Sequence, residues 1–239
     1  MGLTVTVLGC AGSYPAPGEA CSSYLVRSPR TTIWLDAGSG SLANLQRHVD
    51  IVDVDAVVLT HEHPDHTGDL AGFYVACKYY LHREHVPVYA PASVADTVYY
   101  SGPPIAWHIV TDGSEVDVGG LHLSFSRTDH PPETLAVRVD GEGRSLGYSA
   151  DSGPAWSLSK LGPGLDLALC EATYLSEHEG RAQHMSARQA GTSGREAGVG
   201  RLVLTHQQPG TDRDAVLAEG SAAFGSAVEV AVEGAVFDV

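Results

Sequence analysis

The chain has 239 residues, and its hydrophobic share of 43% is that of an ordinary globular protein with a sizeable core. The formal net charge of −15 disfavours non-specific binding to long nucleic acid, because an acidic surface repels a phosphate backbone. No apolar run is long enough to cross a bilayer, and the start lacks the basic segment of a signal peptide, so we expect a cytoplasmic protein that does not enter membranes.

Short apolar, β-branched runs alternate with helical patterns along the chain. Strands are predicted at residues 3–8, 22–27, 31–35, 56–59, 87–89, 121–126, 135–139, 145–148, 165–169, 202–204 and 228–232. Helices are predicted at residues 42–48, 66–82, 93–99, 186–197 and 212–224. Two stacked sheets with helices outside would bury every apolar face. The pattern therefore predicts a single α/β domain, residues 1–239, built as a four-layer αββα sandwich of two mixed sheets.

A cluster of metal-binding residue types follows the apolar strand predicted at residues 56–59. His61, His63, Asp65 and His66 lie within six residues, at the start of a predicted helix. Neutral imidazole and carboxylate are the nitrogen and oxygen donors that zinc prefers. Three imidazoles and one carboxylate on this turn therefore indicate a metal site, although one loop cannot complete the ligand sets of two ions.

Three further candidate ligands lie in the same topological position, each after an apolar run and before a turn. They are His130, Asp151 and His206. In α/β folds, ligands bind beyond the carboxyl ends of strands. We therefore expect these three side chains to meet the first cluster in one pocket.

Together these segments resemble the five ordered motifs of the metallo-β-lactamase superfamily. The segments are Leu35-Asp36-Ala37-Gly38, residues 61–66, His130, Tyr148-Ser149-Ala150-Asp151-Ser152-Gly153 and Leu204-Thr205-His206. The resemblance covers nearly the whole chain. It is strongest to the phosphodiesterase branch, which includes ribonuclease Z and small bacterial cyclic-nucleotide phosphodiesterases.

The resemblance implies a division of the ligands between two metal ions. One ion would take His61, His63 and His130, the other would take Asp65, His66 and His206, and Asp151 would bridge them. Asp36 would orient a ligand or a loop. True β-lactamases carry a cysteine where Asp151 stands, and a bridging carboxylate favours phosphoester chemistry. The nitrogen-rich ligand set favours two Zn2+ ions, while the carboxylates also tolerate Mn2+ or Fe2+.

The resemblance also implies an acid and a base. A hydroxide that bridges the two ions would attack phosphorus, and Asp65 could accept its proton. Glu171 and His184 resemble the ribonuclease Z pair in which a glutamate holds a histidine that serves as general acid. The family's histidine before that glutamate is Cys170 here, so the match is partial. The alternative is that His184 only caps the helix predicted at residues 186–197.

We therefore expect a dinuclear metal-dependent phosphodiesterase that hydrolyses a small anionic phosphodiester, such as a cyclic nucleotide. The main alternative is a ribonuclease Z-type endonuclease that processes transfer-RNA 3′ ends. It is disfavoured because only a hairpin fits between His130 and Asp151, where we would look for an RNA-binding arm. A thioester hydrolase of the glyoxalase II type would carry a helical domain after the last motif, whereas this sequence ends soon after His206.

Several aromatic residues could form a partner surface. They are Tyr79, Tyr80, Tyr99, Tyr100 and Trp107. Such residues could stack a nucleic-acid base, but core packing or the face of a homodimer is the favoured interpretation. A homodimer is an expectation from family analogy alone.

Overall fold

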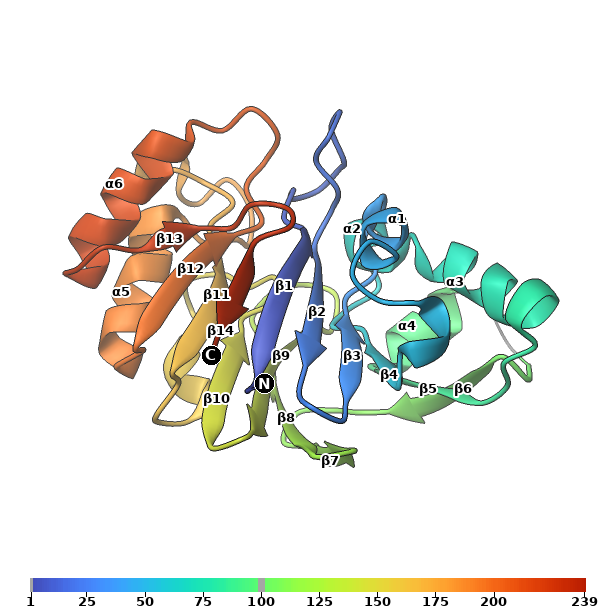
Figure 1. Ribbon diagram of the computed structural model, residues 1–239. Helices are drawn as coiled ribbons and strands as arrows, with labels where there is room; N and C mark the ends of the chain where they lie inside the picture. Colours follow the sequence, from blue (N-terminus) through green and yellow to red (C-terminus); the bar gives the residue numbers. More distant parts are fainter. Residues whose placement is uncertain (1, 99–101) are drawn as a thin grey trace.

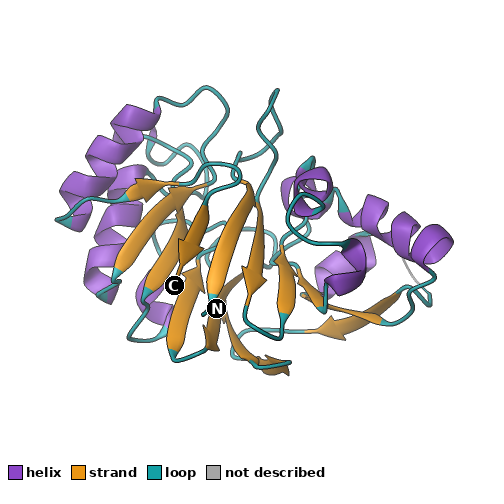
Figure 2. Cartoon of the chain, in the orientation of Figure 1, coloured by secondary structure: helices purple, strands orange, loops and turns teal. Residues whose placement is uncertain are grey.

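The computed structural model describes residues 2–98 and 102–239. Two mixed sheets stack face to face, and helices cover their outer faces, which makes four layers (Figures 1 and 2). The predicted αββα sandwich is therefore confirmed. Within these ranges, none of the helices combines the length and the apolar character needed to cross a membrane.

Each sheet has seven strands in the described part of the chain. The first sheet runs in the order β14 (Val236–Asp238), β1 (Thr4–Gly9), β2 (Ser23–Arg27), β3 (Thr32–Leu35), β4 (Ala56–Val58), β5 (Val86–Ala90) and β6 (Ile105–Ile109). The second runs in the order β13 (Glu229–Val230), β12 (Arg201–Thr205), β11 (Leu167–Glu171), β10 (Arg144–Tyr148), β9 (Leu135–Gly141), β8 (Leu121–Arg127) and β7 (Glu115–Val118). Strands β3 to β6 are mutually parallel, as are β10 to β13. The carboxyl ends within each parallel set therefore lie at one edge of its sheet.

The helices divide between the two outer faces (Figure 1). On the side of the first sheet lie α1 (Ser41–Leu45), α2 (Pro64–Thr67), α3 (Leu70–Ala76) and α4 (Ala92–Thr97), and on the side of the second lie α5 (Ala187–Ala197) and α6 (Arg213–Phe224). Short 3-10 turns occur at Ile51–Asp53, Leu158–Leu161 and Ser176–His178, and a π-helical turn occurs at Cys77–Leu81. Ser186 and Asp212 cap α5 and α6 with their side chains, so the predicted starts at residues 186 and 212 are the caps.

Three apolar layers hold the four structural layers together. In β3, Ile33 and Leu35 belong to the core between the sheets, whereas Trp34 packs under the helices, with its ring 5.4 Å from that of Phe73. Successive side chains of a strand point to opposite faces. The nearly continuous apolar runs in the sequence are therefore strands that are buried on both sides.

The single helix predicted at residues 66–82 is wrong, because the chain breaks it after Thr67. The backbone N–H of Asp69 donates to the carbonyl of Ala37 at 2.8 Å instead of continuing the helix. The Asp69 carboxylate then accepts the N–H of Leu42 at 2.7 Å, at the start of α1. These two tertiary hydrogen bonds hold α2, which carries Asp65 and His66, in a fixed position next to the end of β3.

Three strands were not predicted from the sequence, namely β6, β7 and β14. All three lie at the edge of a sheet. An edge strand buries less of its side chains, so its apolar alternation is weak. In β7, for example, only Val118 is buried.

The aromatic residues do not form one core cluster. The side chains of Tyr79 and Tyr80 are 60% and 77% exposed, so core packing was the wrong expectation for them. Trp107 is half-buried against the core beneath α3 and α4. Tyr99 and Tyr100, with the end of the helix predicted at residues 93–99, lie outside the described residues; α4 ends at Thr97.

Candidate metal centre and acid pair

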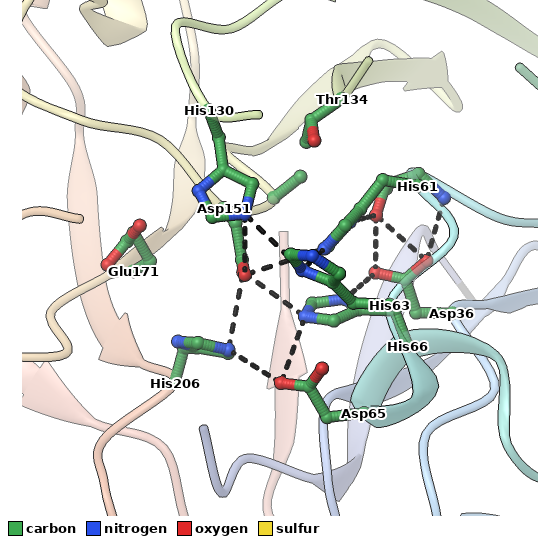
Figure 3. A network of polar contacts seen from close by, with 12 residues as sticks. Asp36, His61, His63, Asp65, His66, His130, Thr134, Asp151, Glu171 and His206 are labelled. Carbon is green, nitrogen blue, oxygen red and sulfur yellow. Dashed lines mark hydrogen bonds and ion pairs between the residues drawn. The ribbon is translucent and has the colours of Figure 1, made fainter. Parts of the chain in front are cut away.

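The seven predicted ligand residues meet in one pocket at the carboxyl-end edge of the sandwich (Figure 3). The turn after β4 and the short helix α2 supply His61, His63, Asp65 and His66, while His130, Asp151 and His206 follow β8, β10 and β12. All are buried except His63, which is half-buried. The expectation that these distant segments would converge is therefore correct.

Left-handed backbone marks three of the strand ends that build the pocket. The φ angles of Asp36, Ala150 and His206 are +54°, +51° and +60°. Glycine would adopt this conformation without steric cost, whereas another residue pays roughly 1–2 kcal/mol. Two of these positions need their side chain in the site, and Ala150 directs the next residue, Asp151, into it. Backbone strain of this kind gathers at functional sites.

The carboxylate of Asp151 lies between two groups of ligand atoms. Its Oδ2 atom is 3.5 Å from His61 Nε2 and 3.8 Å from His130 Nε2. Its Oδ1 atom is 3.1 Å from His66 Nε2 and 3.3 Å from His206 Nε2. Each oxygen thus faces one group, which is the arrangement expected of a bridging ligand.

One more residue completes each group. His63 Nδ1 lies 3.1 Å from His61 Nε2 in the first group. Asp65 Oδ2 lies 3.3 Å from His206 Nε2 in the second. The two groups have the same members as the two ligand sets that the family resemblance implied.

The donor set fits a pair of divalent metal ions. Within each group the potential ligand atoms all lie within 4.8 Å of one another. His66 Nε2 and Asp151 Oδ1 face each other at 3.1 Å without forming a hydrogen bond, and neither atom has another hydrogen-bond partner among the described residues. An unpartnered buried polar atom costs about 1–3 kcal/mol, and a bound cation would remove this cost. Imidazole and carboxylate together are ligands for zinc, and also for manganese or iron.

The surroundings shift the pKa values of two buried histidines in opposite directions. Burial, with the charge of His66, holds the pKa of His61 well below its ordinary value, which keeps that imidazole neutral. Burial also acts to lower the pKa of His66. The negative charges of Asp151, Asp65 and Asp36 outweigh it and hold that pKa well above its ordinary value. The carboxylates therefore create a place where positive charge is stabilised.

Four histidines are held through Nδ1, which leaves Nε2 facing the pocket. The partners of Nδ1 are Asp36 Oδ2 for His66 (2.8 Å), the Gln183 carbonyl for His130 (2.9 Å), Thr60 Oγ1 for His61 (3.1 Å) and Thr173 Oγ1 for His206 (2.8 Å). Such partners fix the ring orientation and the tautomer of a metal-binding histidine. Of these four partners, only Asp36 was expected from the family resemblance to orient a ligand.

Asp36 is a fully buried acceptor for several donors. Its carboxylate accepts from the Thr60 N–H (2.8 Å), the Thr60 hydroxyl (2.9 Å), the Tyr148 hydroxyl (2.9 Å) and His66 Nδ1. The side chain thereby ties the first sheet to the second as well as holding a ligand. The position of Thr60 directly before His61 could have indicated that it lies at the site. Nothing in the sequence pattern indicated the contact between Tyr148 and Asp36.

The expected acid pair lies directly beside the two groups. His184 Nδ1 is 2.9 Å from Oε1 of the buried Glu171. The His184 ring lies 4.8 Å from that of His130 and stacks on that of His206 at 5.4 Å. Burial lowers the pKa of His184, but the hydrogen bond and charge of Glu171 outweigh it and raise the pKa to about 9. The alternative that His184 caps α5 is wrong, because Ser186 is the cap.

Asp36→Asn tests the buried acceptor. One amide oxygen cannot accept from all these donors, and each unsatisfied buried donor costs about 1–3 kcal/mol. We expect the free energy of unfolding to fall by at least about 2 kcal/mol in urea denaturation with chelator present. Metal affinity should fall about 10–100-fold. Asp55→Asn is the matched control, since the exposed Asp55 accepts a single backbone N–H at a strand end. Equal effects of the two variants would contradict the role of Asp36.

Comparison with known proteins places the chain in a family. A model described as the β-lactamase superfamily domain matches residues 31–207. An uncharacterized protein of Mycobacterium tuberculosis is 35% identical over 98% of this chain and 92% of its own length. The probable metallo-hydrolase YhfI of Bacillus subtilis is 31% identical over 99% of this chain and 100% of its own. Its crystal structure matches with a TM-score of 0.92, at 28% identity over 100% of both chains. Ribonuclease Z of Mycobacterium bovis is 27% identical over 87% of this chain and 86% of its own length. The chain therefore belongs to the β-lactamase superfamily and has the metallo-β-lactamase fold.

Proposed function

We propose that this metal-dependent hydrolase is a phosphodiesterase that cleaves a small anionic phosphodiester, such as a cyclic nucleotide, with two divalent ions. Zn2+ is the ion that the ligand set favours. The observation that carries the proposal is the Glu171–His184 pair, at 2.9 Å, in contact with both ligand groups. An alkoxide leaving group needs a proton, which His184 would supply.

Bound to these ligands, two divalent ions would lower the pKa of a water molecule to about 7 and neutralise the charge of a phosphate. The other tasks belong to side chains of this chain. Asp65, whose Oδ2 accepts the N–H of Ser13 at 2.7 Å, would take the proton of the attacking water. His184 would give a proton from Nε2 to the leaving oxygen, while Glu171 holds the ring through Nδ1.

A hollow beside the acid pair offers room for the alcohol part of a substrate. Its lining includes Thr173, Tyr174, His178, Arg181 and residues 208–212. The Tyr174 ring lies 6.1 Å from that of His184 and perpendicular to it. A group that leaves with the proton of His184 would therefore enter a space lined by both apolar and hydrogen-bonding side chains.

Ribonuclease Z-type processing of transfer RNA is the second candidate function, and the similarity to ribonuclease Z of Mycobacterium bovis favours it. Two observations favour the small substrate. Residues 130–151, all within the described part of the chain, contain only the hairpin of β9 and β10 beyond the ligands. The net charge of −15 also opposes binding to a large polyanion.

Turnover of the purified protein on cyclic AMP, beside a precursor transfer RNA, tests the proposal. We expect hydrolysis of cyclic AMP and of bis(p-nitrophenyl) phosphate by the zinc-loaded protein. The metal-free protein should be inactive, and added zinc or manganese should restore turnover. Cleavage of the precursor transfer RNA without cyclic AMP hydrolysis would assign the second function. Full activity of the metal-free protein would refute metal dependence.

His184→Ala tests the acid. A general acid contributes typically about 10²–10⁴-fold, so we expect kcat on an alkyl phosphodiester to fall at least about 10²-fold with metal content unchanged. The loss should be much smaller for bis(p-nitrophenyl) phosphate, because p-nitrophenolate leaves without a proton. His48→Ala is the matched control, because this half-buried histidine belongs to neither ligand group and does not line the hollow. An equal loss on both substrates would reassign His184 to structure.

A further inference from the structure

Two buried threonines occupy equivalent positions in the two halves of the site. The hydroxyl of Thr60 lies between the carboxylate of Asp36 (2.9 Å) and Nδ1 of His61 (3.1 Å). The hydroxyl of Thr173 lies between the carboxylate of Glu171 (2.7 Å) and Nδ1 of His206 (2.8 Å). We call these the Thr60 link and the Thr173 link. The Thr60 link ends at His61 in the first group, and the Thr173 link ends at His206 in the second.

The direction of the hydrogen bonds in the Thr173 link follows from counting donors. Besides Thr173, Glu171 faces the N–H groups of Ser152 (2.7 Å) and Met185 (3.2 Å), with His184 Nδ1 at 2.9 Å. A carboxylate in this setting only accepts. The single hydroxyl proton of Thr173 therefore points to Glu171, and its oxygen accepts the proton of His206 Nδ1.

We propose that Thr173 is a positioning residue that fixes His206 in the Nδ1–H tautomer and joins the acid pair to the second ligand group. Thr60 fixes the same tautomer of His61 in the first group, where its hydroxyl joins that ring to Asp36. With the proton on Nδ1, the lone pair of Nε2 is free, and Nε2 lies 3.3 Å from both Asp65 Oδ2 and Asp151 Oδ1. The same tautomer in His61 directs its Nε2 toward Asp151 Oδ2. The proposal deepens the proposed function, since it rests on the two ligand groups binding metal.

Burial makes both links hard to replace by solvent. The exposed fractions of Thr60 and Thr173 are 0% and 1%, and that of His206 is 2%. When the hydroxyl is removed, water cannot readily take its place, and His206 is free to place its proton on Nε2 instead. That tautomer has no lone pair for a metal at Nε2, so the affinity of the second group falls while the first keeps its ligands.

Nuclear magnetic resonance of the zinc-loaded protein with 15N-labelled histidine reads the two links separately. We expect slowly exchanging Nδ1–H resonances for His61 and His206. Thr173→Val should abolish the protection at His206 alone, and Thr60→Val should abolish it at His61 alone, whereas Thr173→Ser and Thr60→Ser should keep both. If the threonines only supported the fold, each valine variant would disturb both histidine resonances, and not the resonance of its own partner alone.

Zinc titration against a competing chelator gives the second readout. Each valine variant should weaken one of two sites about 10–100-fold, the range typical for partners of metal ligands, and leave the other unchanged. Thr6→Val is the matched control, because Thr6 is fully buried and its hydroxyl has no hydrogen-bond partner among the described residues. It should change neither the resonances nor the zinc affinity.

The proposal is overturned if Thr173→Val leaves both the His206 resonance and zinc affinity unchanged. It is also overturned if the wild-type protein carries the His206 proton on Nε2, a result that needs no variant to fold. The same spectrum of metal-free protein separates the two proposals. If His206 carries its proton on Nδ1 in the metal-free protein and the protein binds no zinc, the proposed metal site is contradicted. The proposed role of Thr173 in fixing the tautomer would then still hold.

Discussion

The rest of the site depends on the contacts that the Asp151 carboxylate makes with the histidines of both groups. The carboxylate is fixed at the end of β10, where the left-handed Ala150 turns it into the pocket, and its two oxygens face different histidine groups. The seven ionisable side chains of the two groups, six of them buried, would otherwise crowd together. Such a cluster is costly unless its charges and lone pairs are matched. A bridging carboxylate with a cation on each side would match them.

The four-layer fold explains why the two halves can meet. Parallel strands in each sheet end at one edge, and the stacking of the sheets brings these edges together. The first sheet supplies one cluster on one turn, while the second supplies single residues from three connections. The hydroxyl of Tyr148 on β10 reaches Asp36 at the end of β3, so the register of the two sheets is fixed by a hydrogen bond that also supports a ligand.

The sequence predicted the internal strands, the layers and all seven members of the ligand cluster, because each depends on local signals. Apolar runs end in turns, and imidazole and carboxylate are rare together at such positions. The sequence could not predict features that depend on tertiary partners. The helix break at Asp69 arises from its bond to Ala37, and the edge strands β6, β7 and β14 carry little apolar alternation. Thr173 has an ordinary sequence context, and its importance follows only from the atoms on either side of its hydroxyl.

Metal content of Asp151→Ala is the most direct test of the bridge. The wild-type protein should hold two zinc ions per chain after dialysis, measured by elemental analysis, and the variant should lose both, since one side chain completes both ligand groups. Circular dichroism and unfolding measurements should establish that the variant is folded. A folded Asp151→Ala protein that keeps two zinc ions per chain would contradict the account.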